Sequence, residues 1–219
     1  MAEDALALAR CRFSGCDADG APEVWALRQA TDPLATPEGA RARMRQAARD
    51  ALRARLAAAF AVPAAAIFIS AQRGESPRAH WQADAQAGDA ALVATGLSIS
   101  HDTGVSLIAW HGAGPVGVDV ARPPADADAA ELARMAQLYL EPNRPSALSY
   151  QAQAAMNIGA FMQRWACHEA RLKCAGLGLV EWSDALAARL AGILAVAVEL
   201  PPWAGDAAAA IAWRAPAAR

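Results

Sequence analysis

Carboxylate and ammonium groups, which serve in acid–base chemistry and in charge stabilisation, recur at helical spacing in the last third of the chain. Phe161, Trp165, Glu169 and Lys173 are each four residues apart, so a helix would place them along one face. Glu169 followed by Lys173 is also the favourable order for a surface ion pair, and Trp165 would suit a core position. The spacing alone therefore leaves a functional site and a structural helix face both open.

Two further polar positions interrupt apolar strands. In the segment 98–102, SISHD, alternation places both serines on one face of a strand and leaves His101 at its end, where a turn would expose it. In the segment 116–120, VGVDV, Asp119 closes an apolar strand, which is costly unless the carboxylate is paired or bound to metal. The ordinary alternatives are an incidental histidine and a loop-capping aspartate.

The elements that must position these residues alternate between helices and short strands. Thr36, Pro37 and Glu38 form a helix start, and the predicted helix runs to about Phe60 with arginines at steps of four. That arginine face is either solvated or directed toward an acidic partner. Strands are predicted at 67–70, 97–101, 105–110 and 115–120, and the last three read as a meander.

The second half repeats the mixture of helix and strand. Helices are predicted over 129–140 and 149–175, the second ending at Gly176, and a closing hairpin over 186–200 and 207–213. We therefore expect an α+β fold of two pseudo-symmetric halves, residues 1–112 and 113–219, each a long helix packed on a small antiparallel sheet.

Bulk composition excludes several classes of protein. The 219 residues carry a formal net charge of −2 with a pI of about 6.1, so no general basic field would attract nucleic acid. Every apolar run is broken by charge or proline before it could span a membrane. The four cysteines match no zinc or redox spacing, and acids follow Met1 where a secretory leader would carry Lys or Arg. We expect a cytoplasmic, monomeric protein.

Taken in order, the motifs resemble those of the surfactin-type phosphopantetheinyl transferases. That family combines an Ile-Ser-His-Ser strand, a Gly-Val-Asp-Val-Glu strand and the helix motif Trp-x-x-Lys-Glu-Ala-x-x-Lys, followed by a Gly-x-Gly turn. Here the last element is WACHEARLK over 165–173, closed by Gly176 and Gly178. The segment 73–77, RGESP, more loosely resembles the family's Gly-Lys-Pro loop. The similarity covers roughly residues 67–180.

The resemblance implies a cleft between the two halves that binds coenzyme A and Mg²⁺, and a carrier-protein serine that attacks the proximal phosphorus. By match, Asp119 and Glu169 would be metal ligands, and Glu169 would also be the general base. Lys173 would stabilise charge on the leaving group. His101 would donate to a phosphate of coenzyme A.

The resemblance, more loosely, also implies phosphate contacts from a loop. The chain departs from the family pattern at three positions. Arg73 and Arg78 are candidates for phosphate contacts because they flank the loop that begins at Gly74. Ala121 stands where the family has a third acid, and His168 stands where a phosphate-binding lysine is expected; its imidazole would be a cation only below about pH 6.5. Asp102 replaces a serine, and could face away from the phosphates or help to hold metal.

The sequence therefore predicts a Mg²⁺-dependent 4′-phosphopantetheinyl transferase that modifies an acyl or peptidyl carrier protein. The alternative, favoured by the departures at Ala121 and His168, is a catalytically impaired homologue that binds coenzyme A or a carrier protein without transfer. A helical interaction module with chance motif matches is the third interpretation.

Overall fold

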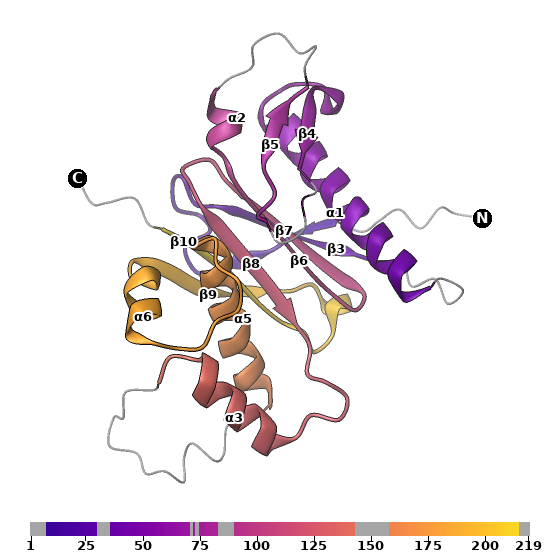
Figure 1. Cartoon of the computed structure of the whole chain (residues 1–219). Helices are drawn as coiled ribbons and strands as arrows, with labels where there is room; N and C mark the ends of the chain where they lie inside the picture. Colours follow the sequence, from indigo (N-terminus) through magenta and orange to yellow (C-terminus); the bar gives the residue numbers. More distant parts are fainter. Residues whose placement is uncertain are drawn as a thin grey trace.

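The computed structural model describes residues 8–29, 36–70, 72, 75–82, 90–142 and 158–214. Two four-stranded antiparallel sheets pack against each other, and a long helix covers the outer side of each (Figure 1). The α+β fold class predicted from the sequence is therefore confirmed.

The first sheet has the strand order β1-β3-β7-β6 and is covered by helix α1 (Pro37–Ala59). The strands are β1 (Leu8–Arg10), β3 (Glu23–Arg28), β6 (Gly96–Asp102) and β7 (Val105–His111). The α1 N-terminus is capped by Thr36, whose hydroxyl accepts a hydrogen bond from the Gly39 N–H. Leu52 of α1 packs against Ile108 of the sheet.

A smaller pair of strands extends this half of the molecule beside α1. The additional elements are a 3₁₀ turn (Ala64–Ala66), β4 (Ile67–Ile69), β5 (Ala79–Trp81) and the short helix α2 (Ala90–Ala94). Strands β4 and β5 pair antiparallel, and β4 packs against α1.

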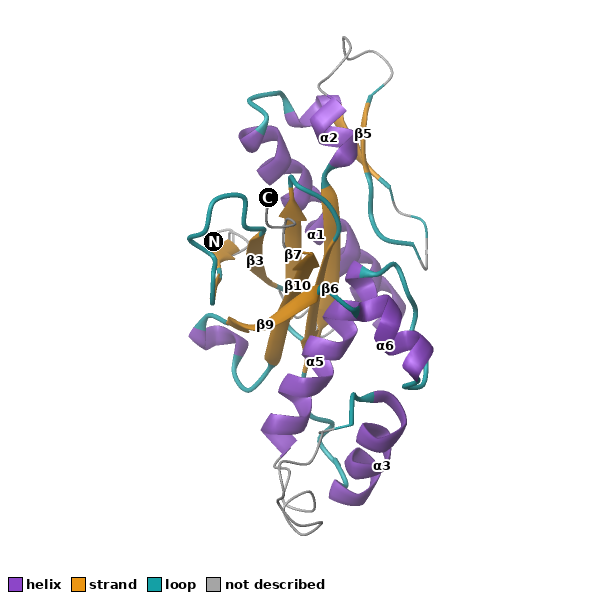
Figure 2. Ribbon diagram, turned by 90° about the vertical axis from the view of Figure 1, so that its left-hand side faces the viewer, coloured by secondary structure: helices purple, strands orange, loops and turns teal. Residues whose placement is uncertain are grey.

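The second sheet has the order β2-β9-β10-β8 and is covered by helix α5 (Ile158–Cys174), as the turned view in Figure 2 shows. The strands are β2 (Arg12–Phe13), β8 (Val116–Ala121), β9 (Ile193–Glu199) and β10 (Ala208–Arg214). The remaining elements are α3 (Ala129–Tyr139), α6 (Asp184–Leu190) and a 3₁₀ turn (Pro202–Ala204).

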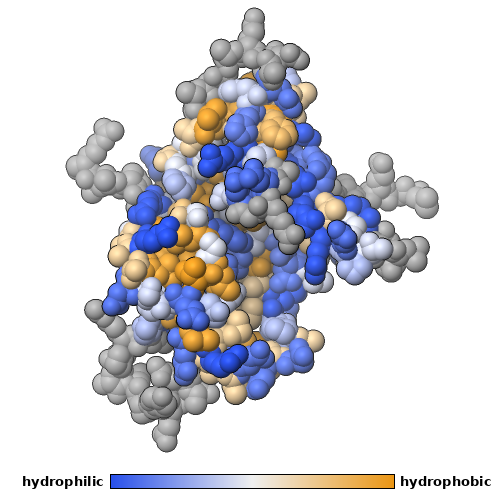
Figure 3. Space-filling model, viewed as in Figure 1, coloured by the Kyte–Doolittle hydropathy of each residue, from blue (hydrophilic) through white to orange (hydrophobic). Residues whose placement is uncertain are grey.

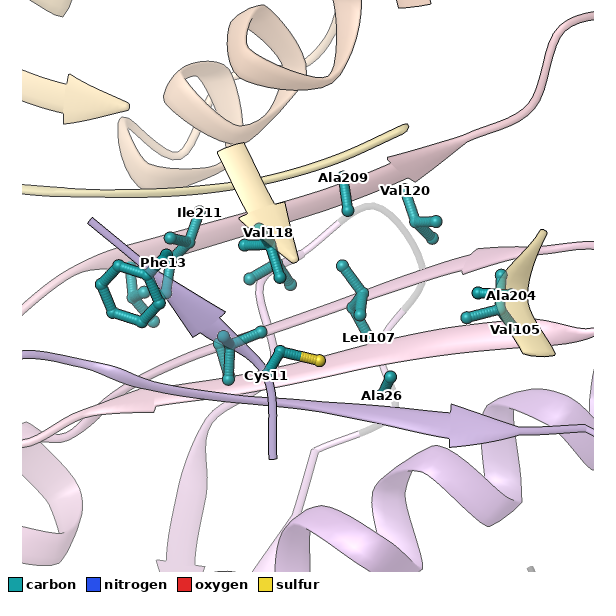
Figure 4. Packing of buried hydrophobic residues seen from close by; sticks show 14 of the residues in the cluster. Cys11, Phe13, Ala26, Val105, Leu107, Val118, Val120, Ala204, Ala209 and Ile211 are labelled. Atoms are coloured by element: carbon teal, nitrogen blue, oxygen red, sulfur yellow. The ribbon is translucent and has the colours of Figure 1, made fainter. Parts of the chain in front are cut away.

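The main core lies between the two sheets. Leu107 of β7, Val118 of β8 and Ile211 of β10 are fully buried there and point toward one another (Figure 4). Because side chains alternate along each strand, the opposite face of β8 is left to face helix α5. Gly117 and Asp119 occupy that face, and this arrangement decides where the polar residues lie.

Several predicted elements agree with the structure. Helix α1 matches the prediction from Thr36 to Phe60, and α3 matches 129–140. Helix α5 ends at Cys174, and Gly176 follows with a φ of +67°, the left-handed conformation of a helix C-terminus. The first nine residues predicted for that helix, 149–157, lie outside the described residues.

Two predictions were wrong. The three central strands are not one meander, because β8 leaves the first sheet after β7 and pairs with β10 instead. The closing hairpin begins later than predicted, because 186–190 belong to helix α6, whose N-terminus is capped by the Ser183 hydroxyl. The sequence reading also missed β5 and α2.

The division into halves at residues 112 and 113 stays a prediction. The chain does change sheets between β7 and β8, close to that point. Strand β2, however, comes from the N-terminal part of the chain and pairs with β9 in the second sheet. Among the described residues, no helix is long and apolar enough to cross a membrane.

Candidate active site

A ladder of side-chain hydrogen bonds joins the edge of the first sheet to the edge of the second. Alternate side chains of β6 accept hydrogen bonds from alternate backbone N–H groups at β8. The three bonds are Val118 N to Ser98 Oγ (3.0 Å), Val120 N to Ser100 Oγ (3.3 Å) and Arg122 N to Asp102 Oδ2 (2.6 Å). These N–H groups belong to an edge strand and point away from β10, so the β6 side chains supply the partners that a neighbouring strand would otherwise give.

This ladder accounts for Asp102, which replaces the family's serine. Its carboxylate accepts hydrogen bonds from the backbone N–H groups of Arg122 and Thr103. The Arg122 side chain in turn bonds to the Thr103 carbonyl and to Asp206. Asp102 is therefore engaged in holding the ends of β6 and β8 together.

Ser100, which accepts the second of these three hydrogen bonds, also belongs to a polar cluster with Asp119 and Lys173. Ser100 Oγ donates to Asp119 Oδ1 at 2.9 Å, and Lys173 Nζ donates to the same Oδ1 at 2.8 Å. Lys173 Nζ also donates to Ser100 Oγ at 3.0 Å and to the Val118 carbonyl at 3.1 Å. All three N–H bonds of the ammonium therefore have acceptors within the protein.

Burial governs the ionisation of this cluster. Asp119 is only 7% exposed, and the loss of water around its carboxylate raises its pKa above the ordinary value, although Lys173 and Ser100 act in the opposite direction. An aspartate at this depth needs a counter-charge, and Lys173 supplies one. The sequence reading left paired and metal-bound states open for Asp119, and the structure contains the pair.

The glycine before Asp119 lets helix α5 approach β8 closely. A Cβ atom built on Gly117 would lie 2.0 Å from the Ala170 carbonyl oxygen and 2.6 Å from the Cys174 nitrogen, distances that no side chain could occupy. Any larger residue would push α5 away from the sheet. The close approach allows the Lys173 side chain to reach Asp119.

Glu169 lies one helical turn before Lys173 and is half-buried. No hydrogen bond or ion pair with a described residue is made by its carboxylate. Burial raises its pKa, and the negative charge of Asp119 raises it further, while Lys173 lowers it. The two acids from β8 and α5 are therefore close enough to repel each other, and the carboxylate of Glu169 is available to act as a base or as a ligand.

His101 is separated from this cluster by one strand position and faces α1. Its Nδ1 lies 2.7 Å from Ser106 Oγ. Burial lowers its pKa to about 4, and the positive charges of Lys173, Arg45 and Arg49 contribute. The imidazole is half-buried rather than exposed at a turn, and it is neutral at pH 7.

The arginine face of α1 thus reaches the same region. Arg45 is exposed and Arg49 half-buried, and neither forms an ion pair with a described carboxylate. Figure 3 shows a mostly hydrophilic surface on the side where α1 lies. Together with Lys173, these arginines give the surroundings of His101 a positive potential that would attract an anionic ligand.

His168 does not join the cluster. It is 4% exposed and lies near the rings of Trp165 and Trp182, with ring centroids 6.5 and 6.1 Å away. It lines a different pocket of about 440 Å³, together with Glu141 and Arg171. Burial lowers its pKa to about 4, and its Nε2 has no hydrogen-bond partner among the described residues. This placement gives no support to the expected contact with a phosphate.

Of the two loop arginines, only Arg78 is among the described residues, and it makes no contact with the cluster. Arg73 lies outside the described residues. Arg78 precedes β5, and its side chain is exposed. Its backbone forms hydrogen bonds with Ser70, whereas its side chain forms none with a described residue. Ala121, at the position of the missing acid, packs partly against the apolar cluster of Leu132 and Phe161.

Sequence reasoning missed the role of Ser100 and left Arg45 and Arg49 as a surface face. The alternation of Ser98, Ser100 and Asp102 was the available signal, because small polar residues at every second position can bond to a neighbouring edge strand. This alternation could not predict the hydrogen bonds, because the sequence does not show that β8 lies beside β6.

Searched against models of protein families, the chain matches none, and it has no significant match among curated proteins.

Proposed function

We propose that this protein is a 4′-phosphopantetheinyl transferase that moves the phosphopantetheine arm of coenzyme A onto a serine of an acyl or peptidyl carrier protein. The main support is the meeting of Ser100, Asp119 and Lys173 with Glu169 alongside. These residues come from the three motif segments on which the family resemblance depends, and they lie on β6, β8 and α5.

The donor set fits a hard divalent cation. Asp119 and Glu169 offer carboxylate oxygens, the ligands that Mg²⁺ prefers, and their mutual repulsion would be relieved by a cation near both. Among the described residues, no group of three or more His, Cys, Asp or Glu side chains is placed to hold a metal, so water and phosphate oxygens would complete the coordination. When bound, Mg²⁺ would neutralise charge on the diphosphate.

The residues of the chain would then carry the following step. The hydroxyl oxygen of the carrier serine forms a bond to the proximal phosphorus of coenzyme A, and the phosphoanhydride bond breaks. The serine proton passes to Glu169, which is free of partners among the described residues. Adenosine 3′,5′-bisphosphate leaves with the electron pair of the broken bond. The contact between Lys173 and Asp119 would hold α5 against β8 during this step. Lys173 can exchange one of its three acceptors for a phosphate oxygen.

His101 and the α1 arginines would bind the phosphates of coenzyme A. A phosphate oxygen only accepts hydrogen bonds, and a neutral imidazole still offers one N–H. Arg45 and Arg49 add the charge that His101 itself lacks at pH 7. The same positive surface could attract the acidic surroundings of a carrier serine.

Binding without transfer remains the second candidate, and particular contacts favour it. Lys173 is fully engaged by protein acceptors, Ala121 supplies no third carboxylate, and His168 is buried elsewhere as a neutral ring. Each of these features would weaken metal or phosphate binding.

Calorimetry together with a transfer assay separates the two candidates. Purified protein is titrated with coenzyme A and, separately, with apo-carrier proteins, and is also incubated with coenzyme A, Mg²⁺ and a panel of apo-carrier proteins. Coenzyme A binding with a mass gain of one phosphopantetheine arm on a carrier supports transfer. Binding with no mass gain at any Mg²⁺ or Mn²⁺ concentration supports the impaired homologue. Absence of binding and of transfer contradicts both.

A further inference from the structure

A buried relay of hydrogen bonds runs behind His101. Gln29 Nε2 donates to Ser106 Oγ at 2.9 Å, and Ser106 Oγ lies 2.7 Å from His101 Nδ1. Ser106 is fully buried and Gln29 is only 9% exposed. The sheet register explains the contact, because His101 of β6 and Ser106 of β7 are directly paired across the two strands. The Gln29 backbone is fixed by its own hydrogen bond to the Gly104 carbonyl.

The direction of the relay follows from the donors and acceptors. The amide nitrogen of Gln29 can only donate, so the Ser106 oxygen accepts there. The hydroxyl proton of Ser106 is buried and needs an acceptor, and His101 Nδ1 is the one that the described residues provide. A nitrogen that accepts carries no proton in neutral imidazole. The proton of the ring is therefore on Nε2.

Burial keeps the His101 ring neutral, and the positive charges of Lys173, Arg45 and Arg49 act in the same direction on its pKa. The adjacent Asp102 is held by the backbone N–H groups of Arg122, just after β8, and of Thr103, in the turn between β6 and β7. Among the described residues none makes a hydrogen bond to Nε2, so this nitrogen is left to donate to a ligand.

We propose that Gln29 and Ser106 are positioning residues that hold His101 in its Nε2–H tautomer, so that the site presents a neutral donor to a phosphate oxygen. The ligand half of this inference rests on the function proposed above, and the tautomer half does not. With the other tautomer, Nε2 would present a lone pair to an anion, and the two would repel each other. A hydrogen bond to a charged phosphate is worth roughly a tenfold change in affinity.

The most informative variant is Gln29→Glu, which keeps the size of the side chain and reverses the relay. A carboxylate can only accept, so it would take the Ser106 proton, and Ser106 would then accept from Nδ1–H. Gln137→Glu is the matched control, because it adds the same charge at an exposed position of α3, outside the relay and away from the α1 arginines. Ser106→Ala removes the relay altogether.

The tautomer is measured on the full chain labelled with ¹⁵N-histidine, by long-range ¹H–¹⁵N correlation at pH 8. The wild type and Gln137→Glu should show His101 protonated at Nε2, Gln29→Glu should show it protonated at Nδ1, and Ser106→Ala should show a mixture. Protonation of the wild type at Nδ1, or an unchanged signal in Gln29→Glu, would overturn the positioning role.

The ligand half is measured by calorimetry with adenosine 3′,5′-bisphosphate as the probe. Affinity should fall about tenfold in Gln29→Glu and remain within about twofold in Gln137→Glu. Equal affinity in Gln29→Glu with a reversed tautomer would overturn the donation to phosphate. A wild type that binds no probe would contradict the proposed function together with the ligand half, whereas the spectra would still decide the tautomer half.

Discussion

The ammonium of Lys173 lies 2.8 Å from Oδ1 of Asp119, and this contact ties helix α5 to strand β8. The two residues stand in motifs that are far apart in the sequence, and each was singled out there for a separate reason. Ser100 joins them from a third segment by donating to the same oxygen. The predictions below test whether this cluster is only structural or also serves a reaction.

Ser100→Ala should impair both stability and activity, whereas Ser98→Ala should impair mainly stability. Each serine accepts a hydrogen bond from a β8 N–H group, so each change leaves a buried donor unpaired, at about 1–3 kcal/mol. Only Ser100 also contacts Asp119 and Lys173. Denaturant unfolding should therefore show a loss of stability in both variants, whereas the initial rate of carrier modification should fall mainly in Ser100→Ala. Equal losses of rate would argue against a role for the cluster.

Gly117→Ala should separate α5 from β8. The added Cβ would meet the Ala170 carbonyl oxygen at 2.0 Å, so the helix must move, at a cost of roughly 1–3 kcal/mol or more. Transfer activity should fall because Lys173 would no longer reach Asp119. Gly112→Ala is the control, since its Cβ would meet only Trp110 at 3.8 Å. Thermal unfolding measures both variants, and an unchanged Tm for Gly117→Ala would contradict the close approach.

His168→Phe should stabilise the protein and reduce its sensitivity to acid. Phenylalanine fits between Trp165 and Trp182 and removes a buried nitrogen without a partner, a gain of about 1 kcal/mol. In the wild type, the pKa of His168 in the folded state is about 4, below the ordinary value of 6.5. The unfolded state therefore binds more protons than the folded state between pH 4 and pH 6.5. The stability that a neutral His168 contributes is thus present above pH 6.5 and lost as the pH falls toward 4.

The pH dependence is measured as the difference in unfolding free energy between the wild type and His168→Phe from pH 7 to pH 4. The difference should grow by up to about 1.4 kcal/mol per pH unit in that window. The control is His80→Phe, because the side chain of His80 is exposed. Coenzyme A affinity should be unchanged in His168→Phe. A large loss of affinity would place His168 at the phosphates after all.

Ala121→Glu should lower the Mg²⁺ concentration needed for half-maximal activity, because it restores the third acid of the family pattern. Ala121 is half-buried and packs against Leu132 and Phe161, so the variant should also lose some stability, on the order of 1 kcal/mol. The measurement is transfer rate against Mg²⁺ concentration. Ala127→Glu, a change beside the same apolar cluster, is the control for the cost of packing.

The sequence predicted local structure well where the signals were local. The cap at Thr36 and the glycine after Cys174 located the ends of two helices, because both depend on nearby backbone groups. The path of β8 could not be predicted in this way. Its apolar alternation fits either sheet, and its place in the second depends on pairing with β10 and on the close approach of α5 at Gly117, which join distant parts of the chain.

The site was predicted in part for the same reason. Two separate motifs with fixed spacing in the sequence made Asp119, Glu169 and Lys173 candidates, and the structure brings Asp119 and Lys173 into contact. Ser106 and Gln29 belong to no motif, and their relation to His101 follows from strand register. His168 sits next to Glu169 in the sequence but about 100° away around the helix, which directs it to another pocket.

The most direct test of the proposed function is the intact mass of an apo-carrier protein after incubation with coenzyme A, Mg²⁺ and either the wild type or Glu169→Gln. The wild type should add one phosphopantetheine arm to the carrier, and a carrier lacking the acceptor serine should stay unmodified. Glu169→Gln should retain the fold and coenzyme A binding but transfer roughly 10²–10⁴-fold more slowly. An equal rate for the variant, or no mass gain with the wild type on any carrier, would contradict the proposal.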